Sequence, residues 1–165
     1  MVKQLMNHKG FKIALIVVLV LLVSTTIRFV GTGQVGVVTR FGNVTGRELG
    51  EGAHFVLPLG VERVNRYDVK VLKEEATDIT AATADLQDVK ATVVLNYNLD
   101  RTKVSEIHQT IGRDFKDKLI NPAVSETFKA ASSKYTASEM ITNRAEIKKD
   151  AYEALKARLT RYGIA

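Results

Sequence analysis

The 165-residue sequence contains no cysteine and no tryptophan. Without cysteine, the chain can form no disulfide, thiolate metal site, cysteine nucleophile or palmitoylated anchor, and its redox compartment cannot be inferred. Without tryptophan, an aromatic belt at a membrane boundary would depend on Phe11 and Phe29 alone. Acidic residues are also missing from the N-terminal part, because none occurs before Glu48.

Recognisable catalytic motifs are absent as well. The sequence contains no G-x-S-x-G, S-x-x-K, H-E-x-x-H or P-loop pattern. His8, His54 and His108 are far apart in the chain, and a zinc site needs three or four ligands. The carboxylates are scattered among cations. We therefore expect no catalytic, cofactor-binding or metal-binding residues, no cofactor, and no enzymatic activity.

The net charge of +6 belongs mainly to the N-terminal end. Residues 1–30 hold four basic side chains and no acidic one, whereas the remainder holds 20 basic and 18 acidic side chains. A nucleic-acid-binding domain would carry a basic stripe on its folded part. The sequence shows no such stripe, so nucleic acid is not an expected partner.

A nearly unbroken apolar run, Ile13 to Ile27, follows the basic N-terminus. With its flanks, Phe11 to Val30, it reaches the ~20 residues that cross a bilayer as a helix. Its strictly apolar centre also fits a signal peptide, but Ser24 to Thr26 make a poor cleavage site. A buried helix of a soluble core would show a polar face. We therefore predict a basic flank over 1–12 and a transmembrane anchor over 13–30.

Charges on the two sides of this run predict its orientation. Lys3, Lys9 and Lys12 precede it, and only Arg28 follows closely. The positive-inside rule then places the N-terminus in the cytoplasm and the following domain on the opposite side of the bilayer. That side is the periplasm for a bacterial inner membrane and the intermembrane space for a mitochondrial inner membrane. The expected protein is a single-pass membrane protein with the lipid bilayer as partner.

Residues 31–36 read GTGQVG, a literal G-x-G-x-x-G. A dinucleotide fingerprint needs a strand before it and a helix opening within it. Here an apolar run precedes the glycines and the strand-like VVTRF follows them. We therefore interpret this segment as a flexible exit from the membrane, followed by a strand over Gln34 to Phe41.

The next segment contains turns, an apolar stretch and a strand. Ala53 to Leu59 reads AHFVLPL, and Pro58 excludes a central strand because it cannot donate to the ladder. Two interpretations stay open: an edge strand with a turn, or an apolar loop that dips into the membrane. Val61 to Leu72 mixes valines with charged residues and predicts a long strand with one exposed face.

The clearest strand covers Asp88 to Leu99, where apolar and mostly polar residues alternate with a period of two. Thr77 to Thr83 predicts its neighbour, and Ala84 to Gln87 predicts the turn between them. The pattern favours an antiparallel hairpin with one face toward water.

Helices are predicted after Asp100, which can cap a helix over Arg101 to Ile111. Asn121-Pro122 is a start signal, with a capping side chain followed by proline at the first helical position. Thr136 and Asn143 each begin a capping-box pattern with a glutamate three residues later. The last helix has one apolar face, made of Ile147, Ala151, Leu155, Leu159 and Tyr162.

Several segments, each weak alone, are specific in their order and spacing. Together they resemble the SPFH (band 7) domain family, and most of all the prohibitins. The resemblance covers residues 31–165, with strands at about 34–99 and helices at about 101–162. The segments are GVVTRFGNV (36–44), EGAHFVLP (51–58), RYDVKV (66–71), TADLQDVKATVVLNYNLD (83–100), NPAVSETFKAASSKYTASEMITNR (121–144) and RYGI (161–164).

The resemblance implies an α+β domain, in which antiparallel strands precede helices, and a scaffold rather than an enzyme. Such proteins assemble into membrane-bound rings or cages that organise a membrane patch, as homo-oligomers or with a paralogue. Some restrain a membrane AAA protease. Family members continue into a coiled coil that drives assembly, and this sequence ends at Ala165 before it. We therefore expect a fragment or a short form.

An alternative hypothesis is a membrane-attached enzyme or accessory hydrolase with an unrecognised active site. It predicts that folding brings together an acid/base pair or a metal set from separate segments.

Overall fold

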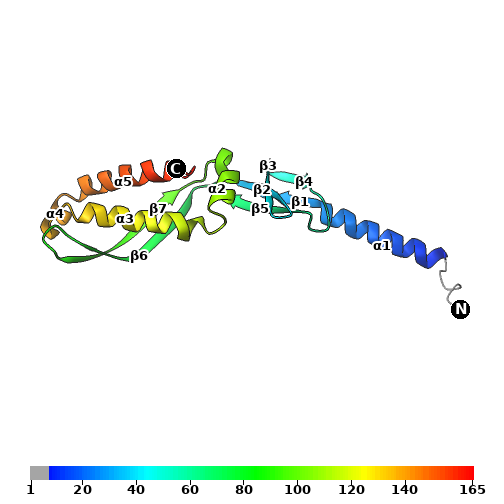
Figure 1. Cartoon of the computed structure of the whole chain (residues 1–165), viewed down its shortest axis with the longest axis horizontal. Helices are drawn as coiled ribbons and strands as arrows, with labels where there is room; N and C mark the ends of the chain where they lie inside the picture. The colour runs from blue at the N-terminus through cyan, green and yellow to red at the C-terminus, as the bar shows by residue number, and fades with distance from the viewer. Residues whose placement is uncertain (1–7) are drawn as a thin grey trace. The chain divides into compact units, whose positions relative to one another are not determined.

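The computed structural model describes residues 8–165 and divides the chain into two compact units, with the boundary between Tyr67 and Asp68 (Figure 1). We call the part up to Tyr67 unit 1 and Asp68–Ala165 unit 2. Antiparallel strands come first and most of the helices follow them, which confirms the predicted α+β class.

Unit 1 begins with helix α1 (His8–Thr26) and continues as five short strands. β1 (Ile27–Val30) pairs antiparallel with β4 (Gly52–Phe55). β2 (Gln34–Arg40) lies between β3 (Asn43–Leu49) and β5 (Glu62–Asp68). The core of this unit contains Val30, Val38, Leu49 and Val56.

The predicted anchor over 13–30 ends too late. The helix stops at Thr26, and the next four residues form β1 instead. β-Branched residues at 25–27 favour this change, because their side chains lose rotamer freedom in a helix and fit a strand well. Burial of Val30 in the core then fixes the strand. Within residues 8–165, no helix has both the length and the apolarity required to cross a membrane.

The glycine-rich segment at 31–36 forms a turn, closed by a hydrogen bond of 3.1 Å from Gln34 N to Gly31 O. Strand β2 follows it, as the sequence predicted. Gly36 is required within that strand, because a Cβ there would lie 2.7 Å from Val64 Cγ1. The glycines therefore serve a turn and close packing between strands.

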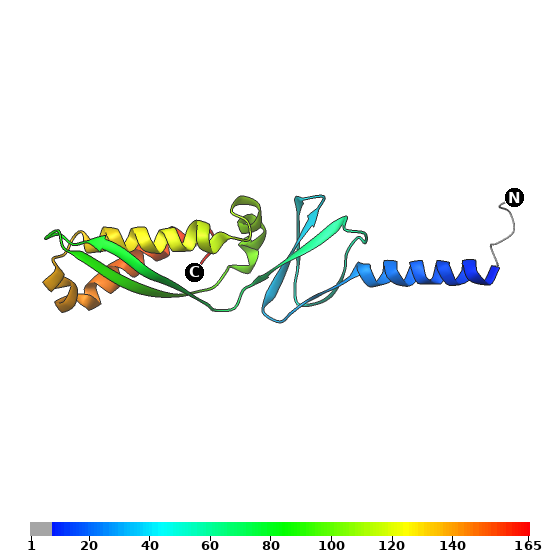
Figure 2. The same ribbon diagram turned by 90° about the horizontal axis from the view of Figure 1, so that it is seen from below.

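Unit 2 is a long hairpin covered by helices (Figure 2). β6 (Leu72–Ala82) pairs antiparallel with β7 (Asp88–Tyr97), which confirms the predicted hairpin. Helix α3 packs against both β6 and α5. The helical elements are η1 (Arg101–Lys103), α2 (Val104–Thr110), η2 (Lys116–Ile120), α3 (Asn121–Ser132), α4 (Ala137–Thr142) and α5 (Arg144–Thr160).

Two capping predictions are confirmed. Asp100 accepts a hydrogen bond of 2.9 Å from Thr102 N at the start of η1. Thr136 and Glu139 form a reciprocal capping box at the start of α4. The apolar face of α5 is also largely confirmed, since Ile147, Leu155 and Leu159 are buried.

Three local predictions are wrong. The long strand over residues 61–72 is interrupted, because β5 ends at Asp68 and β6 begins at Leu72. Asn121-Pro122 marks the start of α3 as predicted, but the capping role of Asn121 is wrong, since π-helical η2 leads directly into α3 and the Asn121 side chain donates to Asp117. The Asn143 side chain makes no cap hydrogen bond.

Candidate functional site

Helix α1 exposes apolar side chains on all of its sides. Each of its large apolar side chains from Phe11 to Val23 that the structure describes is 51–62% exposed. These residues gain nothing from a protein core, and soluble proteins rarely leave so large an apolar surface open to water. The helix therefore presents a continuous surface that suits an apolar partner.

The outer face of the β1–β4 sheet continues this apolar character. Ile27 lies opposite Phe55, and Phe29 lies opposite Ala53, so the four side chains share one face. Phe29 and Phe55 are exposed there. The other face carries Val30, which is buried in the core. The sheet thus directs two phenylalanines outward.

Two more large apolar side chains are held on turns in unit 1. Phe41, after β2, has φ 48°, and Leu59, after β4, has φ 61°. Both are 79% exposed. Left-handed backbone is unfavourable for bulky residues, and such strain is concentrated at functional sites. A hydrogen bond of 3.1 Å from Phe41 N to Val61 O joins the two turns.

The turn after β4 also contacts the end of α1. Val56 N donates to Thr26 O over 2.8 Å, and the exposed Leu57 follows immediately. The apolar surface of α1 and these side chains therefore lie close together at the helix end. We call the set formed by Phe29, Phe41, Phe55, Leu57 and Leu59 the apolar platform.

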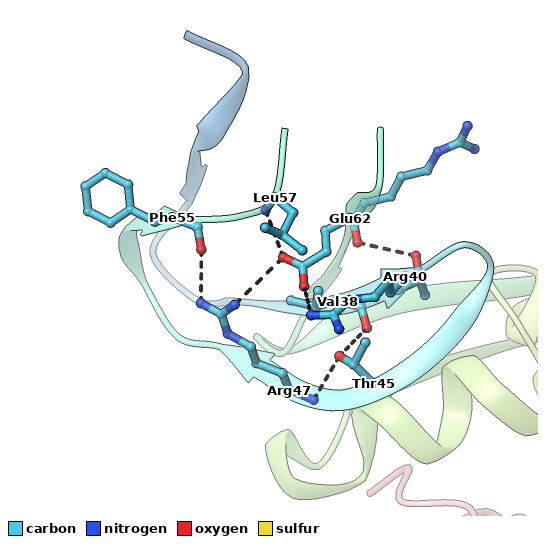
Figure 3. A network of polar contacts seen from close by, with 9 residues as sticks. Val38, Arg40, Thr45, Arg47, Phe55, Leu57 and Glu62 are labelled. Carbon is cyan, nitrogen blue, oxygen red and sulfur yellow. Dashed lines mark hydrogen bonds and ion pairs between the residues drawn. The ribbon is translucent and has the colours of Figure 1, made fainter. Parts of the chain in front are cut away.

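A buried carboxylate holds the platform in place (Figure 3). The Glu62 side chain is only 2% exposed. It accepts hydrogen bonds from Leu57 N at 2.9 Å and from Arg40 Nη2 at 2.8 Å. Arg47 Nη1 lies 3.8 Å from the same carboxylate, while Arg47 Nη2 donates to Phe55 O at 3.0 Å. Glu62 thus links strands β2, β3 and β5 to the platform.

The electrostatics of this cluster favour an ionised Glu62. The Leu57 N–H, and then the Arg40 guanidinium, hold the pKa of Glu62 below its usual value, although burial opposes them. A carboxylate accepts at both oxygens, whereas protonation turns one oxygen into a donor and removes the charge that strengthens the bonds to Leu57 N and Arg40. The exposed leucine turn is therefore anchored by a charge buried beneath it.

The predicted lone histidines stay separate. His54 Nε2 lies 2.7 Å from Gly50 O, and burial lowers the pKa of His108, with Arg113 adding to the shift. The side chain of His8 lies outside the described residues. In the part of the chain with described side chains, no three His, Asp or Glu groups lie close enough to hold a metal.

Three ionisable side chains of unit 2 interact with one another: Lys116, Glu74 and Tyr97. Lys116 Nζ lies 3.0 Å from Glu74 Oε2, and this contact raises the pKa of Lys116. Burial raises the pKa of Tyr97, whose ring meets Phe115 edge-on. A lysine held in its charged form is neither a nucleophile nor a base. The arrangement suits an ion pair joining the hairpin to η2.

Sequence reasoning found part of this site. It singled out the apolar run and residues 53–59. For the latter the structure shows the edge strand with a turn, since Gly52–Phe55 is a strand and the leucines follow it, while entry of this turn into a membrane stays a prediction. Sequence reasoning missed Glu62, because a single glutamate in a strand with alternating charges normally indicates the exposed face.

The family model described as "SPFH domain / Band 7 family" matches residues 28–165. The chain belongs to this family. It is 30% identical over 141 residues to mitochondrial prohibitin complex protein 1 of Caenorhabditis elegans, covering 85% of this chain and 50% of the relative. Prohibitin-2 of Dictyostelium discoideum is 28% identical over 147 residues, covering 87% of this chain and 48% of the relative.

A third relative, Prohibitin-2 of Saccharomyces cerevisiae, is 29% identical over 128 residues, which cover 78% of this chain and 41% of the relative. The predicted resemblance is therefore confirmed. The chain spans about half the length of these curated relatives.

Proposed function

We propose that the chain is a membrane-attached scaffold whose copies assemble side by side on a lipid bilayer. The observation that carries the proposal is the apolar surface of α1, which nothing in the described chain covers. Lipid is the partner that buries such a surface on all sides of a helix. Burying several valine and leucine side chains contributes roughly 1.5–3 kcal/mol each, enough for stable attachment.

The apolar platform adds a second lipid contact. It lies where α1 ends, so a helix embedded in lipid brings Phe41, Leu57 and Leu59 to the bilayer surface. Arg40 and Arg47 remain half exposed beside it, where they can face lipid phosphates. The platform then sets the distance between the strands of unit 1 and the membrane.

Assembly follows from attachment. Tethering confines copies to two dimensions and raises their effective concentration, so weak lateral contacts suffice. Repeated identical contacts close into rings when the rotation permits. The name of the C. elegans relative supports a complex. We propose a homo-oligomer, or a hetero-oligomer with a paralogue.

Removal of the helix tests attachment. A variant with residues 1–25 replaced by a Gly/Ser linker keeps Thr26, its hydrogen bond to Val56 and all of β1. We expect it in the soluble fraction after a high-salt wash, while the full chain sediments with membranes. The matched control is the full chain carrying Ile141→Ser, which removes an exposed apolar side chain elsewhere. A linker variant that still sediments with membranes would contradict attachment through α1.

Assembly is tested by negative-stain imaging of the detergent-extracted protein. Rings or cages are the expected particles, and dispersed monomers would contradict the scaffold. A hydrolase screen of the same preparation addresses the enzymatic alternative. Activity that survives replacement of α1 would favour the enzyme.

Orientation stays a prediction of the lysine distribution, with the N-terminus cytoplasmic and the domain extracytoplasmic. Because the chain lacks cysteine, a single Ile141→Cys variant reports the side directly. An impermeant maleimide should label it in intact spheroplasts or mitoplasts, and protection from the reagent would reverse the prediction.

Restraint of a membrane AAA protease also stays a proposal, carried by the resemblance. Deleting the gene should shorten the half-lives of membrane substrates of such a protease. Unchanged half-lives would contradict the restraint.

A further inference from the structure

The turn between β6 and β7 contains one highly exposed leucine, Leu86. Leu86 is 89% exposed and has φ 58°, a backbone conformation that glycine or asparagine adopts more easily. The turn itself is fixed: Thr83 Oγ1 donates to Asp85 Oδ1 at 2.6 Å, and Ala137 N donates to the same oxygen at 3.1 Å. The apolar side chain is therefore held outward on a well-anchored support.

A groove of about 310 Å³ lies between α3 and α5 in the same unit. Alanine side chains from both helices line it, and its rim is charged. Arg158 and Glu126 form an ion pair on the rim, and Tyr135 Oη donates to Asp150 at 3.5 Å. The lining residues used below are Ala130, Ala154, Lys134 and Tyr135.

We propose that Leu86 of one copy inserts into the α3–α5 groove of a second copy. This inference rests on the proposed assembly and names the contact that produces it. An apolar centre surrounded by a polar rim is the usual anatomy of an interface. The occupant is the β6–β7 turn of an identical chain.

Charge complementarity supports this occupant. Asp88 lies two residues beyond Leu86, at the first position of β7, and is exposed. Lys134 lies on the rim of the groove and is exposed. Within residues 8–165, neither side chain has an ion-pair partner in its own chain. Insertion of Leu86 brings the Asp88 carboxylate toward the Lys134 ammonium of the second copy.

The positions of turn and groove suit a ring. Ala84 N donates to Tyr135 O at 2.8 Å, so the turn lies beside the end of α3 that contributes to the groove. Figures 1 and 2 both show the turn at the end of unit 2 where α3 leads into α4. The β6–β7 turn and the α3–α5 groove are two different surfaces near the same end of unit 2. A contact between the turn of one copy and the groove of the next is head-to-tail, and such contacts can close into rings.

Cross-linking tests the contact in the full chain, because every introduced cysteine is the only one. Two differently tagged copies, one with Leu86→Cys and one with Ala154→Cys, are expressed together and treated in membranes with a short bis-maleimide. We expect a dimer band that carries both tags. The matched control replaces Leu86→Cys by Val71→Cys, an exposed residue just before β6, and should give at least about tenfold less product.

Charge reversal provides an independent test. Asp88→Lys or Lys134→Asp alone should lower the yield of cross-linked oligomer about fivefold, because one rim pair contributes up to about 1 kcal/mol. The double variant Asp88→Lys/Lys134→Asp should restore the yield. Failure of the double variant to recover any yield would overturn the pairing of these two residues.

Leu86→Gly separates the contact from folding. Glycine relieves the left-handed strain, so the Tm should not fall, while the large assemblies should be lost. If unmodified chains form no assembly, the proposed scaffold fails. If they assemble, yet the Leu86→Cys/Ala154→Cys pair gives no more product than the control and Leu86→Gly assembles normally, only this contact is wrong.

Discussion

The two units treat apolar side chains in opposite ways. Unit 1 leaves α1 and the apolar platform exposed, whereas unit 2 exposes only a few isolated large apolar side chains. Their charges differ in the same sense: unit 1 has eight basic and three acidic side chains, and unit 2 has sixteen and fifteen. A basic, apolar surface suits lipid, and a balanced polar surface suits water and contacts between copies. In the proposed function, unit 1 would provide attachment and unit 2 assembly.

The largest loss of stability is expected from a substitution in the core of unit 2, and it tests whether the two units have separate cores. Ile120 is completely buried, and Ile120→Ala should lower the free energy of unfolding by about 3–4 kcal/mol through lost burial and a cavity. Hydrogen exchange should show faster exchange across residues 68–165. An equal increase across residues 34–67 would contradict the description of two units with separate cores.

A smaller effect is expected in unit 1. Glu62→Ala leaves Leu57 N without its acceptor and separates Arg40 from its partner. We expect a loss of about 2 kcal/mol, since the arginines are half exposed and screened by water. Hydrogen exchange at Leu57 should accelerate. Slow exchange at Leu57 in the variant would show that the carboxylate does not hold the turn.

The same carboxylate predicts a pH dependence with a definite sign. The pKa of Glu62 is lower in the folded state than its usual value of 4.5, so the ionised form favours folding. This contribution is fully present above about pH 5 and is lost as the pH falls through the folded pKa. Thermal unfolding between pH 3 and 7 measures it. Glu62→Gln should flatten the acid side of the profile.

Helix capping in unit 2 contributes less. Thr136→Ala removes the capping box of α4 and should cost about 1 kcal/mol in urea unfolding. Thr142→Ala is the matched control, because its hydroxyl only donates to Ser138 O within the same helix. Equal effects from the two variants would argue against a capping role.

The smallest effect on stability is expected from a tryptophan placed in the apolar platform, where its fluorescence reports contact with lipid. Phe41→Trp introduces the only tryptophan, at an exposed position, and should alter stability by less than about 0.5 kcal/mol. Brominated lipids should quench its fluorescence in vesicles. The fluorescence of Ile141→Trp in unit 2 should not be quenched. Equal quenching at both positions would contradict the proposal that lipid contacts unit 1 and not unit 2.

Elements that are marked by a periodic pattern or by local hydrogen bonds were predicted correctly. Alternation identified the β6–β7 hairpin, and Asp100 and Thr136 were correct caps because their hydrogen bonds are local. Asn121-Pro122 correctly marked the start of α3, but Asn121 does not cap it because the preceding segment is π-helical, which no local signal marks. The end of α1 was misplaced because pairing of Ile27 with Phe55 involves distant residues.

The sequence identified most of the apolar residues of the candidate site, but not how they are held in place. The apolar run and the leucines of residues 53–59 are visible in one dimension. Glu62 is buried only because Arg40, Arg47 and Leu57 converge on it from three segments. The proposed role of Leu86 could not be predicted either, since it depends on a left-handed backbone angle.

The last residues of the described chain pair with the segment that directly follows β7. Asn98 and Ala165 exchange two backbone hydrogen bonds, of 2.8 and 3.0 Å, beside the bridge between Leu99 and Ile164. Closing a loop of about 67 residues is entropically unfavourable and slow, so we expect this pairing to form after α3 has docked on β6. Contacts that form after the folding barrier control the rate of unfolding rather than folding. We therefore expect that removing these two hydrogen bonds would mainly speed the unfolding of unit 2 and would change its folding rate little.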